Sequence, residues 1–280
     1  MINRHAMNSF PLLTTPRRRP TFPSVTKWRR TILFGDTHVP FHDQSAIALV
    51  VDVVADAHPD VLIHMGDLVD CWQISDFDKD PARKETLQDD CDTAREVLRT
   101  LQKAAPNATR YLLEGNHEDR LRRAIWRMPE KQRQLAQLRC FRDNVNWPRL
   151  LELSEVGWQF VQGQGQARAR LLRKLLVKHG SLVRKWSGAT ARAEWERYGK
   201  SGLSGHTHRL GRFYHRDFNG AHVWVETGCT CLLNPEYVED PDWQQGLVVV
   251  SESPDGKRFV AEDVYFQDGR AVWREKEFVA

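Results

Sequence analysis

Short apolar runs alternate with longer amphipathic stretches from residue 31 onward. The runs Thr31–Phe34, Val61–Met65 and Tyr111–Glu114 predict buried β-strands, each followed by a polar loop with a glycine. Between them, Ser45–Ala57 and Ala82–Ala105 carry apolar residues at helical spacing. This strand–helix alternation predicts right-handed βαβ crossovers, a parallel sheet and a functional site at the carboxyl ends of its strands.

The second half of the chain is richer in strand patterns. Residues 119–150 predict a basic helical insertion or cap, interrupted at Pro129 and closed near Pro148. Gln267-Asp268-Gly269 has the composition of a hairpin turn. The expected later elements are strands at Gly157–Val161 and Leu175–Lys178, a helix at Ala189–Tyr198, and strands at Ala221–Glu226, Gly246–Val250, Arg258–Tyr265 and Ala271–Phe278. Their number predicts two sheets packed together with helices outside.

Length and composition favour one large α/β domain. The chain has 280 residues, of which 41% are hydrophobic and 28% charged, which excludes a disordered or fibrous protein. We assign residues 26–280 to this domain and residues 1–25, rich in proline and arginine, to a flexible basic arm. No apolar run approaches the roughly 20 residues that span a bilayer, so no membrane partner is expected. Five cysteines without a CxxC pair fit a reducing cytoplasm.

Positive charge is concentrated in three parts of the chain. The net charge is +4 overall, but +7 over residues 1–30, +6 over 119–150 and +8 over 165–200. These segments predict either a basic surface that attracts a polyanion or ordinary solvated helix faces. Four tryptophans among them could stack on bases, although helical spacing favours anchoring to the core: Trp126, Trp147, Trp186 and Trp195.

Five loops concentrate side chains that bind metals. Aspartate, histidine and asparagine together suit borderline divalent ions such as Mn, Fe, Zn or Ni, rather than Ca or a thiolate zinc site. Taken singly, each loop is a common surface or packing pattern; their order and spacing together predict a metal centre. The loops are Gly35-Asp36-Thr37-His38, Gly66-Asp67-Leu68-Val69-Asp70, Gly115-Asn116-His117-Glu118, Lys178-His179-Gly180 and Gly205-His206-Thr207-His208.

This series resembles the signature of the calcineurin-like metallophosphoesterase superfamily: D-x-H, G-D-x-x-D, G-N-H-[DE], H and G-H-x-H. Every part of the signature is present between residues 35 and 208. The resemblance implies a four-layer α/β/β/α sandwich and a dinuclear centre of two divalent ions, with Mn favoured over Fe, Ni or Zn. It implies a hydrolase that acts on phosphate esters.

The resemblance also implies a role for each matching residue. His117 corresponds to the general acid that protonates the leaving oxygen, and Asp70 to the residue that orients its ring. The support for His179 is weaker than for the other ligands because its motif is short. The seven expected ligands are Asp36, His38 and His208 for the first ion, Asn116, His179 and His206 for the second, and Asp67 as the bridge.

The expected chemistry is hydrolysis by a hydroxide that bridges the metals. Two ions about 3.5–4 Å apart can clamp phosphoryl oxygens and acidify the water between them. The hydroxide attacks in line, and His117 delivers a proton to the departing alkoxide.

Departures from the protein-phosphatase branch bear on the substrate. That branch typically has G-D-x-H-G and G-D-x-x-D-R-G, but here Val39 replaces the glycine and Cys71-Trp72 replaces Arg-Gly. In that branch the arginine would bind the dianion of a phosphate monoester. Here Arg120 could partly take its place as a substrate-binding residue. With the basic segments, this favours a phosphodiester, nucleotide or nucleic-acid substrate.

Two alternatives stay open. One is a phosphomonoesterase or protein phosphatase of the same superfamily. The other is a non-catalytic binding scaffold on this fold, although such scaffolds lose members of the ligand set and this chain keeps them all. The sequence leaves open a homo-oligomer, in which residues 119–150 would form either a substrate cap or a contact between copies.

Overall fold

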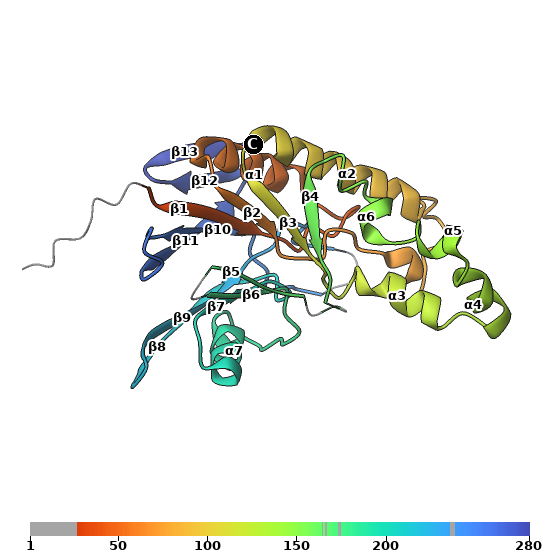
Figure 1. Ribbon diagram of the computed structural model, residues 1–280. Helices are drawn as coiled ribbons and strands as arrows, with labels where there is room; N and C mark the ends of the chain where they lie inside the picture. The colour runs from red at the N-terminus through yellow and green to blue at the C-terminus, as the bar shows by residue number, and fades with distance from the viewer. Residues whose placement is uncertain (1–26, 164, 166, 173–174, 236–238) are drawn as a thin grey trace, which may run out of the picture.

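Two β-sheets pack face to face and carry helices on both outer faces, in a computed structural model that describes residues 27–163, 165, 167–172, 175–235 and 239–280. Figure 1 shows the four layers, with α1 and α2 above the first sheet and α7 below the second. The expected α/β/β/α sandwich is confirmed. The arm assigned to residues 1–25 lies outside the described residues.

The first sheet has the strand order β13-β12-β11-β10-β1-β2-β3-β4. Strands β1 to β4 run parallel to one another, whereas β10 is antiparallel to β1. The last four residues of β1 and all of β2 are buried, which matches their largely apolar sequences. The strand bounds are β1 Arg29–Phe34, β2 Val61–His64, β3 Thr109–Leu113, β4 Trp158–Val161, β10 Gly246–Glu252, β11 Phe259–Gln267, β12 Arg270–Trp273 and β13 Lys276–Val279.

Helices α1 (Gln44–Ala57) and α2 (Leu87–Ala104) cover the outer face of this sheet. The predicted start of α2 at Ala82 is wrong by five residues. Thr86 caps the helix: its hydroxyl accepts from the Asp89 backbone N–H, and the Asp89 carboxylate accepts from that of Thr86. This reciprocal cap fixes the first turn after Thr86.

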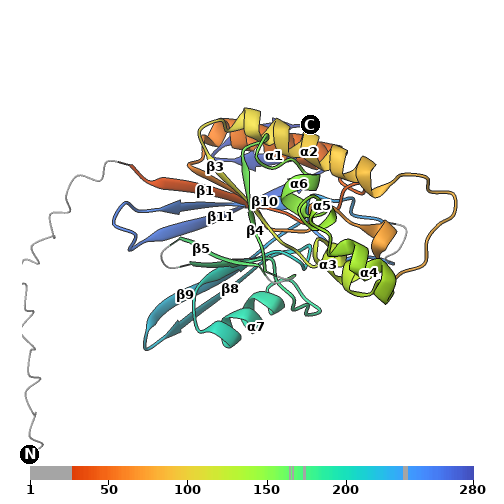
Figure 2. The same ribbon diagram turned by 45° about the vertical axis from the view of Figure 1, so that its right-hand side comes forward.

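The second sheet has the strand order β5-β6-β7-β9-β8, and α7 (Ala189–Tyr198) covers its outer face. Apolar side chains between the sheets, including Leu33, Val177 and Val225, form the central core. Figure 2 shows the same layers from a second direction. The strand bounds are β5 Arg168–Leu172, β6 Leu175–Lys178, β7 Gly202–Ser204, β8 Leu210–Asp217 and β9 Gly220–Thr227. The sequence pattern missed β5, β7 and β8.

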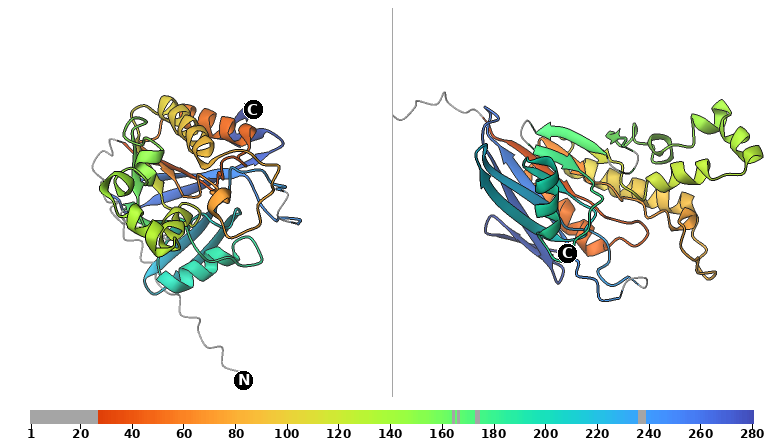
Figure 3. Two further views of the ribbon diagram at one scale, coloured as in Figure 1. Left: turned by 90° about the vertical axis from the view of Figure 1, so that its right-hand side faces the viewer. Right: turned by 90° about the horizontal axis from the view of Figure 1, so that it is seen from below.

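The basic insertion consists of short helices that project from the sandwich (Figure 3). The predicted interruption at Pro129 is present, and the last helix ends at Leu150, near Pro148 as predicted. Pro148 lies in the first turn of a helix, where its missing N–H is not needed. The helices are α3 Asp119–Trp126, α4 Glu130–Ala136, α5 Arg139–Arg142 and α6 Trp147–Leu150.

Two tight turns shape the C-terminal strands. The expected hairpin joins β11 to β12 through Asp268 and Gly269, both with positive φ. The single strand expected over Ala271–Phe278 is two strands, because Arg274 and Glu275 also adopt positive φ and reverse the chain. None of the described helices combines the length and the apolarity that a bilayer crossing requires.

Candidate metal centre

All five metal-binding loops meet at one edge of the sandwich. They follow β1, β2 and β3 in the first sheet and β6 and β7 in the second. Neighbouring strands are parallel within each set, so their carboxyl ends lie side by side. The topology therefore brings these loops together at the strand ends, where the sequence predicts the site.

The first group of candidate ligands is Asp36, His38 and His208, which are buried and have ligand atoms within 4.8 Å of one another. His38 Nε2 lies 3.0 Å from His208 Nε2, and His208 Nε2 lies 3.4 Å from Asp36 Oδ1. Two nitrogens each about 2.1 Å from one ion would be separated by about this distance at a right angle.

The second group is Asp67, His179 and His206, also with ligand atoms within 4.8 Å of one another. Asn116 joins it, because its Oδ1 lies 2.9 Å from His179 Nε2. The Nδ1 of His179 donates to the Met65 carbonyl oxygen at 3.1 Å. That bond leaves Nε2 facing Asn116 and Asp67, the arrangement of most metal-binding histidines.

Asp67 lies between the two groups. Its Oδ2 is 3.2 Å from His179 Nε2 in the second group and 3.8 Å from His38 Nε2 in the first. Its Oδ1 accepts from the backbone N–H of His117 at 2.9 Å, which fixes the carboxylate plane. One carboxylate oxygen therefore faces both groups, as a bridging ligand must.

The charges of these residues are suited to binding cations. Burial opposes ionisation of Asp36 and Asp67, but neighbouring imidazoles hold the pKa of both carboxyls below its ordinary value. Burial likewise opposes protonation of His179 and His208, yet Asp67 raises the pKa of His179 to about 9 and Asp36 raises the pKa of His208 to about 10. The protonated imidazoles thus supply the positive charge that the buried carboxylates require, and bound divalent ions would take their place.

Backbone conformation is unusual at the same positions. Positive φ is uncommon for residues other than glycine and often marks a functional site, because the surrounding structure must hold it. It recurs at five of the seven expected ligands: Asp36, His38, Asp67, His206 and His208.

His117 and Asp70 lie beside the first group. His117 Nδ1 donates to the Asp70 carbonyl oxygen at 2.8 Å and lies 3.3 Å from Asp70 Oδ2. Its Nε2 is 3.8 Å from Asp67 Oδ2 and so faces the centre. Asp70 Oδ2 also lies 3.0 Å from His38 Nδ1, so one carboxylate contacts both rings. The sequence motif predicts only the contact with His117.

Arg120 packs against the same pair. Its Nη1 donates to the Asp70 carbonyl oxygen at 2.7 Å, and its Nη2 lies 3.2 Å from His117 Nε2. The guanidinium is thus placed at the ring nitrogen that faces the centre.

Two buried glutamates hold the ligand loops. Neither has a role predicted from the sequence. Glu118 accepts from the backbone N–H groups of Asp67, Leu68, Val69 and Gly115, at 2.9, 2.7, 3.2 and 2.8 Å. Glu226 accepts from the Thr207 hydroxyl at 2.8 Å, and from two backbone N–H groups where α7 begins. Glu118 is the acidic residue that ends the G-N-H-[DE] motif, and this position was the sequence signal for its role. No sequence motif marks Glu226.

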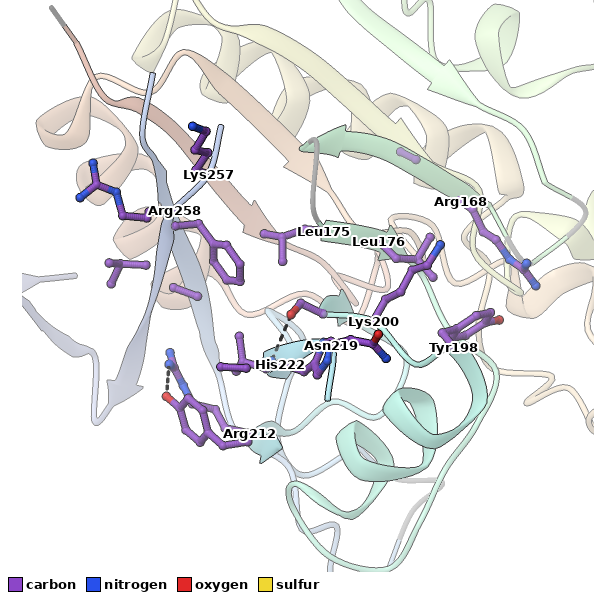
Figure 4. A pocket seen from close by; sticks show the side chains of 18 residues that line it. Arg168, Leu175, Leu176, Tyr198, Lys200, Arg212, Asn219, His222, Lys257 and Arg258 are labelled. Atoms are coloured by element: carbon purple, nitrogen blue, oxygen red, sulfur yellow. Dashed lines mark hydrogen bonds between the residues drawn. The ribbon is translucent and has the colours of Figure 1, made fainter. Parts of the chain in front are cut away.

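A cavity of about 1030 Å³ opens elsewhere, between the two sheets. It reaches Leu175 at the start of β6, whereas His179 follows the end of that strand. None of the expected metal ligands lines it. Figure 4 shows the cationic side chains around it, which are Arg168, Lys200, Arg212, Lys257 and Arg258. The volume of a cavity therefore does not locate the candidate metal centre in this fold.

The sequence profile of calcineurin-like phosphoesterases matches residues 29–210. The chain belongs to this family. The matched range contains all five ligand loops and ends two residues after His208. Family membership and the two ligand groups together support a metal-dependent phosphoesterase.

Relatives of this calcineurin-like phosphoesterase occur in mycobacteriophages. It is 25% identical over 253 residues to the Gene 54 protein of Mycobacterium phage D29, covering 86% of this chain and 95% of that protein. It is 24% identical over 254 residues to the Gene 54 protein of Mycobacterium phage L5, with the same coverage. Vacuolar Protein Sorting 29 from Cryptosporidium parvum shares 12% identity and a TM-score of 0.47, over 90% of this chain and 99% of that structure.

Proposed function

We propose that this protein hydrolyses phosphodiesters at a centre of two divalent ions, Mn being favoured. The observation that carries the proposal is the position of Asp67 Oδ2 between the ligand groups, 3.2 Å from His179 Nε2 and 3.8 Å from His38 Nε2. Asp36, His38 and His208 would hold one ion, and Asn116, His179 and His206 the other. When bound, two such ions neutralise phosphoryl oxygens and lower the pKa of a coordinated water.

The remaining residues handle the proton of the leaving group. His117 presents Nε2 to the centre while Asp70 holds its Nδ1, so the ring is oriented toward the departing oxygen. Arg120 donates to Nε2 at 3.2 Å and cannot accept, so this contact must give way when Nε2 carries the proton that His117 delivers. Asp67 and Asp70 together raise the pKa of His117 against the opposing effect of burial, which favours the protonated acid.

A phosphodiester, in a nucleotide or a nucleic acid, is the favoured substrate. Arg120 is engaged with Asp70 and His117, so we assign it to the leaving-group side of the site rather than to a monoester dianion. Residues 119–150, with a net charge of +6, begin directly after the motif of Asn116 and His117 and suit a polyanionic substrate. We propose a cytoplasmic location on the pattern of cysteine usage.

The first test removes single ligands. We expect Asp67→Ala or His206→Ala to abolish Mn-dependent hydrolysis of bis-p-nitrophenyl phosphate and to reduce the number of bound ions per chain. His222→Ala is the matched control, because that histidine pairs with Asp217 on the β8–β9 hairpin, away from the ligand loops. Undiminished turnover in the ligand variants would refute the site, and turnover of aryl monoesters alone would favour the phosphomonoesterase alternative.

The second test addresses His117. A general acid contributes about 10²- to 10⁴-fold, and most when the leaving group is poor. We therefore expect His117→Ala to lose far more rate on a dinucleotide, whose leaving group is an alkoxide, than on bis-p-nitrophenyl phosphate. Equal losses on both substrates would remove the acid role.

A further inference from the structure

The four tryptophans of residues 119–150 and 165–200 divide into two buried or packed and two exposed. Trp147 is 4% exposed and donates its Nε1–H to the Glu118 carbonyl oxygen at 2.7 Å. Trp195 packs on His215 with ring centroids 3.8 Å apart. Trp126 and Trp186, by contrast, are 60% and 65% exposed. Anchoring to the core therefore explains the first two rings and leaves the other two unexplained.

Each exposed ring carries a cation on its face. The guanidinium of Arg122 lies 4.0 Å from the Trp126 ring centroid, and the ammonium of Lys185 lies 4.7 Å from that of Trp186. A solvent-facing indole offers a base a surface for stacking. At Trp186 the Lys185 ammonium also offers the phosphate a counter-charge, whereas Arg122 beside Trp126 is already paired with both carboxylate oxygens of Asp119, at 2.6 and 2.8 Å.

The first ring is tied to the metal centre through α3. That helix begins three residues after Asn116, and Arg123 within it donates to the Asn116 carbonyl oxygen at 3.2 Å. Trp126 ends the helix, seven residues beyond Asp119, which places it roughly 10 Å along the axis from the start. A chain of one or two nucleotides covers such a distance.

The second ring is tied to the same centre from the other sheet. Trp186 lies in the loop that follows His179, and Arg209, next to His208, donates to the Arg184 carbonyl oxygen of that loop at 2.6 Å. Figure 2 shows α3 and the chain leading into α7 at the same end of the two sheets. In the described part of the chain, neither Arg184 nor Lys185 pairs with a carboxylate, so this loop presents unneutralised positive charge.

We propose that Trp126 and Trp186 are stacking platforms on the two sides of the metal centre, which hold the bases of a single-stranded nucleic acid while its backbone crosses the site. The inference rests on the proposed phosphoesterase function and names its substrate class. A single strand is required because the bases of a duplex are already stacked on each other and cannot receive an indole face.

Steady-state kinetics with the full chain loaded with Mn test the platforms. Trp126→Ala, Trp186→Ala and the double variant are compared on dT20, rU20 and bis-p-nitrophenyl phosphate. We expect each alanine to raise KM for the single strands roughly 5- to 100-fold, which lowers the preference for oligonucleotide over the aryl diester. Trp126→Phe and Trp186→Phe should recover most of the loss. Phe218→Ala, which removes a fully exposed ring at the β8–β9 turn, should leave the preference unchanged.

Binding separates this inference from the function on which it rests. Fluorescence anisotropy with phosphorothioate dT20, alone or annealed to its complement, should show tighter binding of the single strand. Variants that hydrolyse dT20 as well as the wild type does, or a duplex that binds as tightly, would overturn the platforms and leave the phosphoesterase intact. Tryptophan-dependent binding without hydrolysis of any ester would support the platforms and overturn the proposed function.

Discussion

At the scale of single residues, Glu118 shows how a site depends on a group outside the ligand set. Its carboxylate accepts from four backbone N–H groups, three of them in the loop that carries Asp67. An amide at this position has one acceptor oxygen, and its NH₂ would face a backbone N–H. We expect Glu118→Gln to lower the free energy of unfolding by about 1–3 kcal/mol and to weaken Mn binding, measured by urea unfolding and metal titration.

The control for Glu118 is Glu155→Gln, because Glu155 is exposed and its replacement should change neither quantity. Unchanged Mn affinity in Glu118→Gln would show that the loop holds its shape without this carboxylate.

His64 makes a residue-scale prediction about pH. It is fully buried, its Nε2 lies 2.8 Å from the Thr37 hydroxyl, and burial lowers its pKa from 6.5 to about 3. The unfolded chain takes up a proton below pH 6.5 while the folded chain does not, so the stability from this group is present above 6.5 and is lost as the pH falls toward 3. By pH 5 the loss is about 2 kcal/mol.

The measurement compares urea unfolding at pH 7 and pH 5 in the wild type and His64→Gln. We expect the variant to lose less stability between the two pH values, because its amide does not titrate and the other histidines contribute equally to both proteins. The same loss in both would contradict the buried neutral imidazole.

At the scale of elements, a buried ion pair joins β6 to α7. Lys178 Nζ lies 2.8 and 3.1 Å from the two carboxylate oxygens of Glu194, and both side chains are almost fully buried. Removing one partner leaves an uncompensated buried charge, so we expect Glu194→Ala to destabilise the protein by about 3–5 kcal/mol. Because Lys178 directly precedes His179, Mn affinity should fall as well.

Two comparisons define this effect. The double variant Lys178→Met/Glu194→Leu removes both charges and should recover most of the stability. Glu196→Ala breaks an exposed pair with Arg192 on the same helix and should change stability by less than about 1 kcal/mol. If the double variant were as unstable as Glu194→Ala, packing rather than charge would explain the loss.

At the scale of the whole molecule, the proposed ions join the two sheets, because their ligands follow β1, β2 and β3 in one sheet and β6 and β7 in the other. Ions that bind only the folded chain stabilise it, by about 4 kcal/mol at a thousandfold excess over Kd. We expect EDTA to lower Tm and Mn to restore it, measured by calorimetry. Asp67→Ala should respond to neither, and a wild-type Tm indifferent to both would contradict the centre.

The sequence by itself determined what depends on neighbours along the chain. Apolar runs that end in glycine-containing loops located β1, β2, β3 and β6, and parallel topology then carried Asp36 and Asp67 to one edge. Periodicity found α1 and α7, and the order of the motifs indicated the family and the ligand set. Three-residue β7 was too short to leave a pattern, although the loop after it was identified by His206 and His208.

Only the tertiary structure decided which side chains meet or remain exposed. Trp126 and Trp147 lie in the same basic insertion, yet one faces solvent and the other is buried on Glu118. Asp70 contacts His38 from 32 positions away as well as His117, and Glu226 reaches both Thr207 and the start of α7. Local patterns fix backbone conformation through short-range sterics and burial, whereas these contacts depend on how two sheets and an insertion pack, which only the folded chain defines.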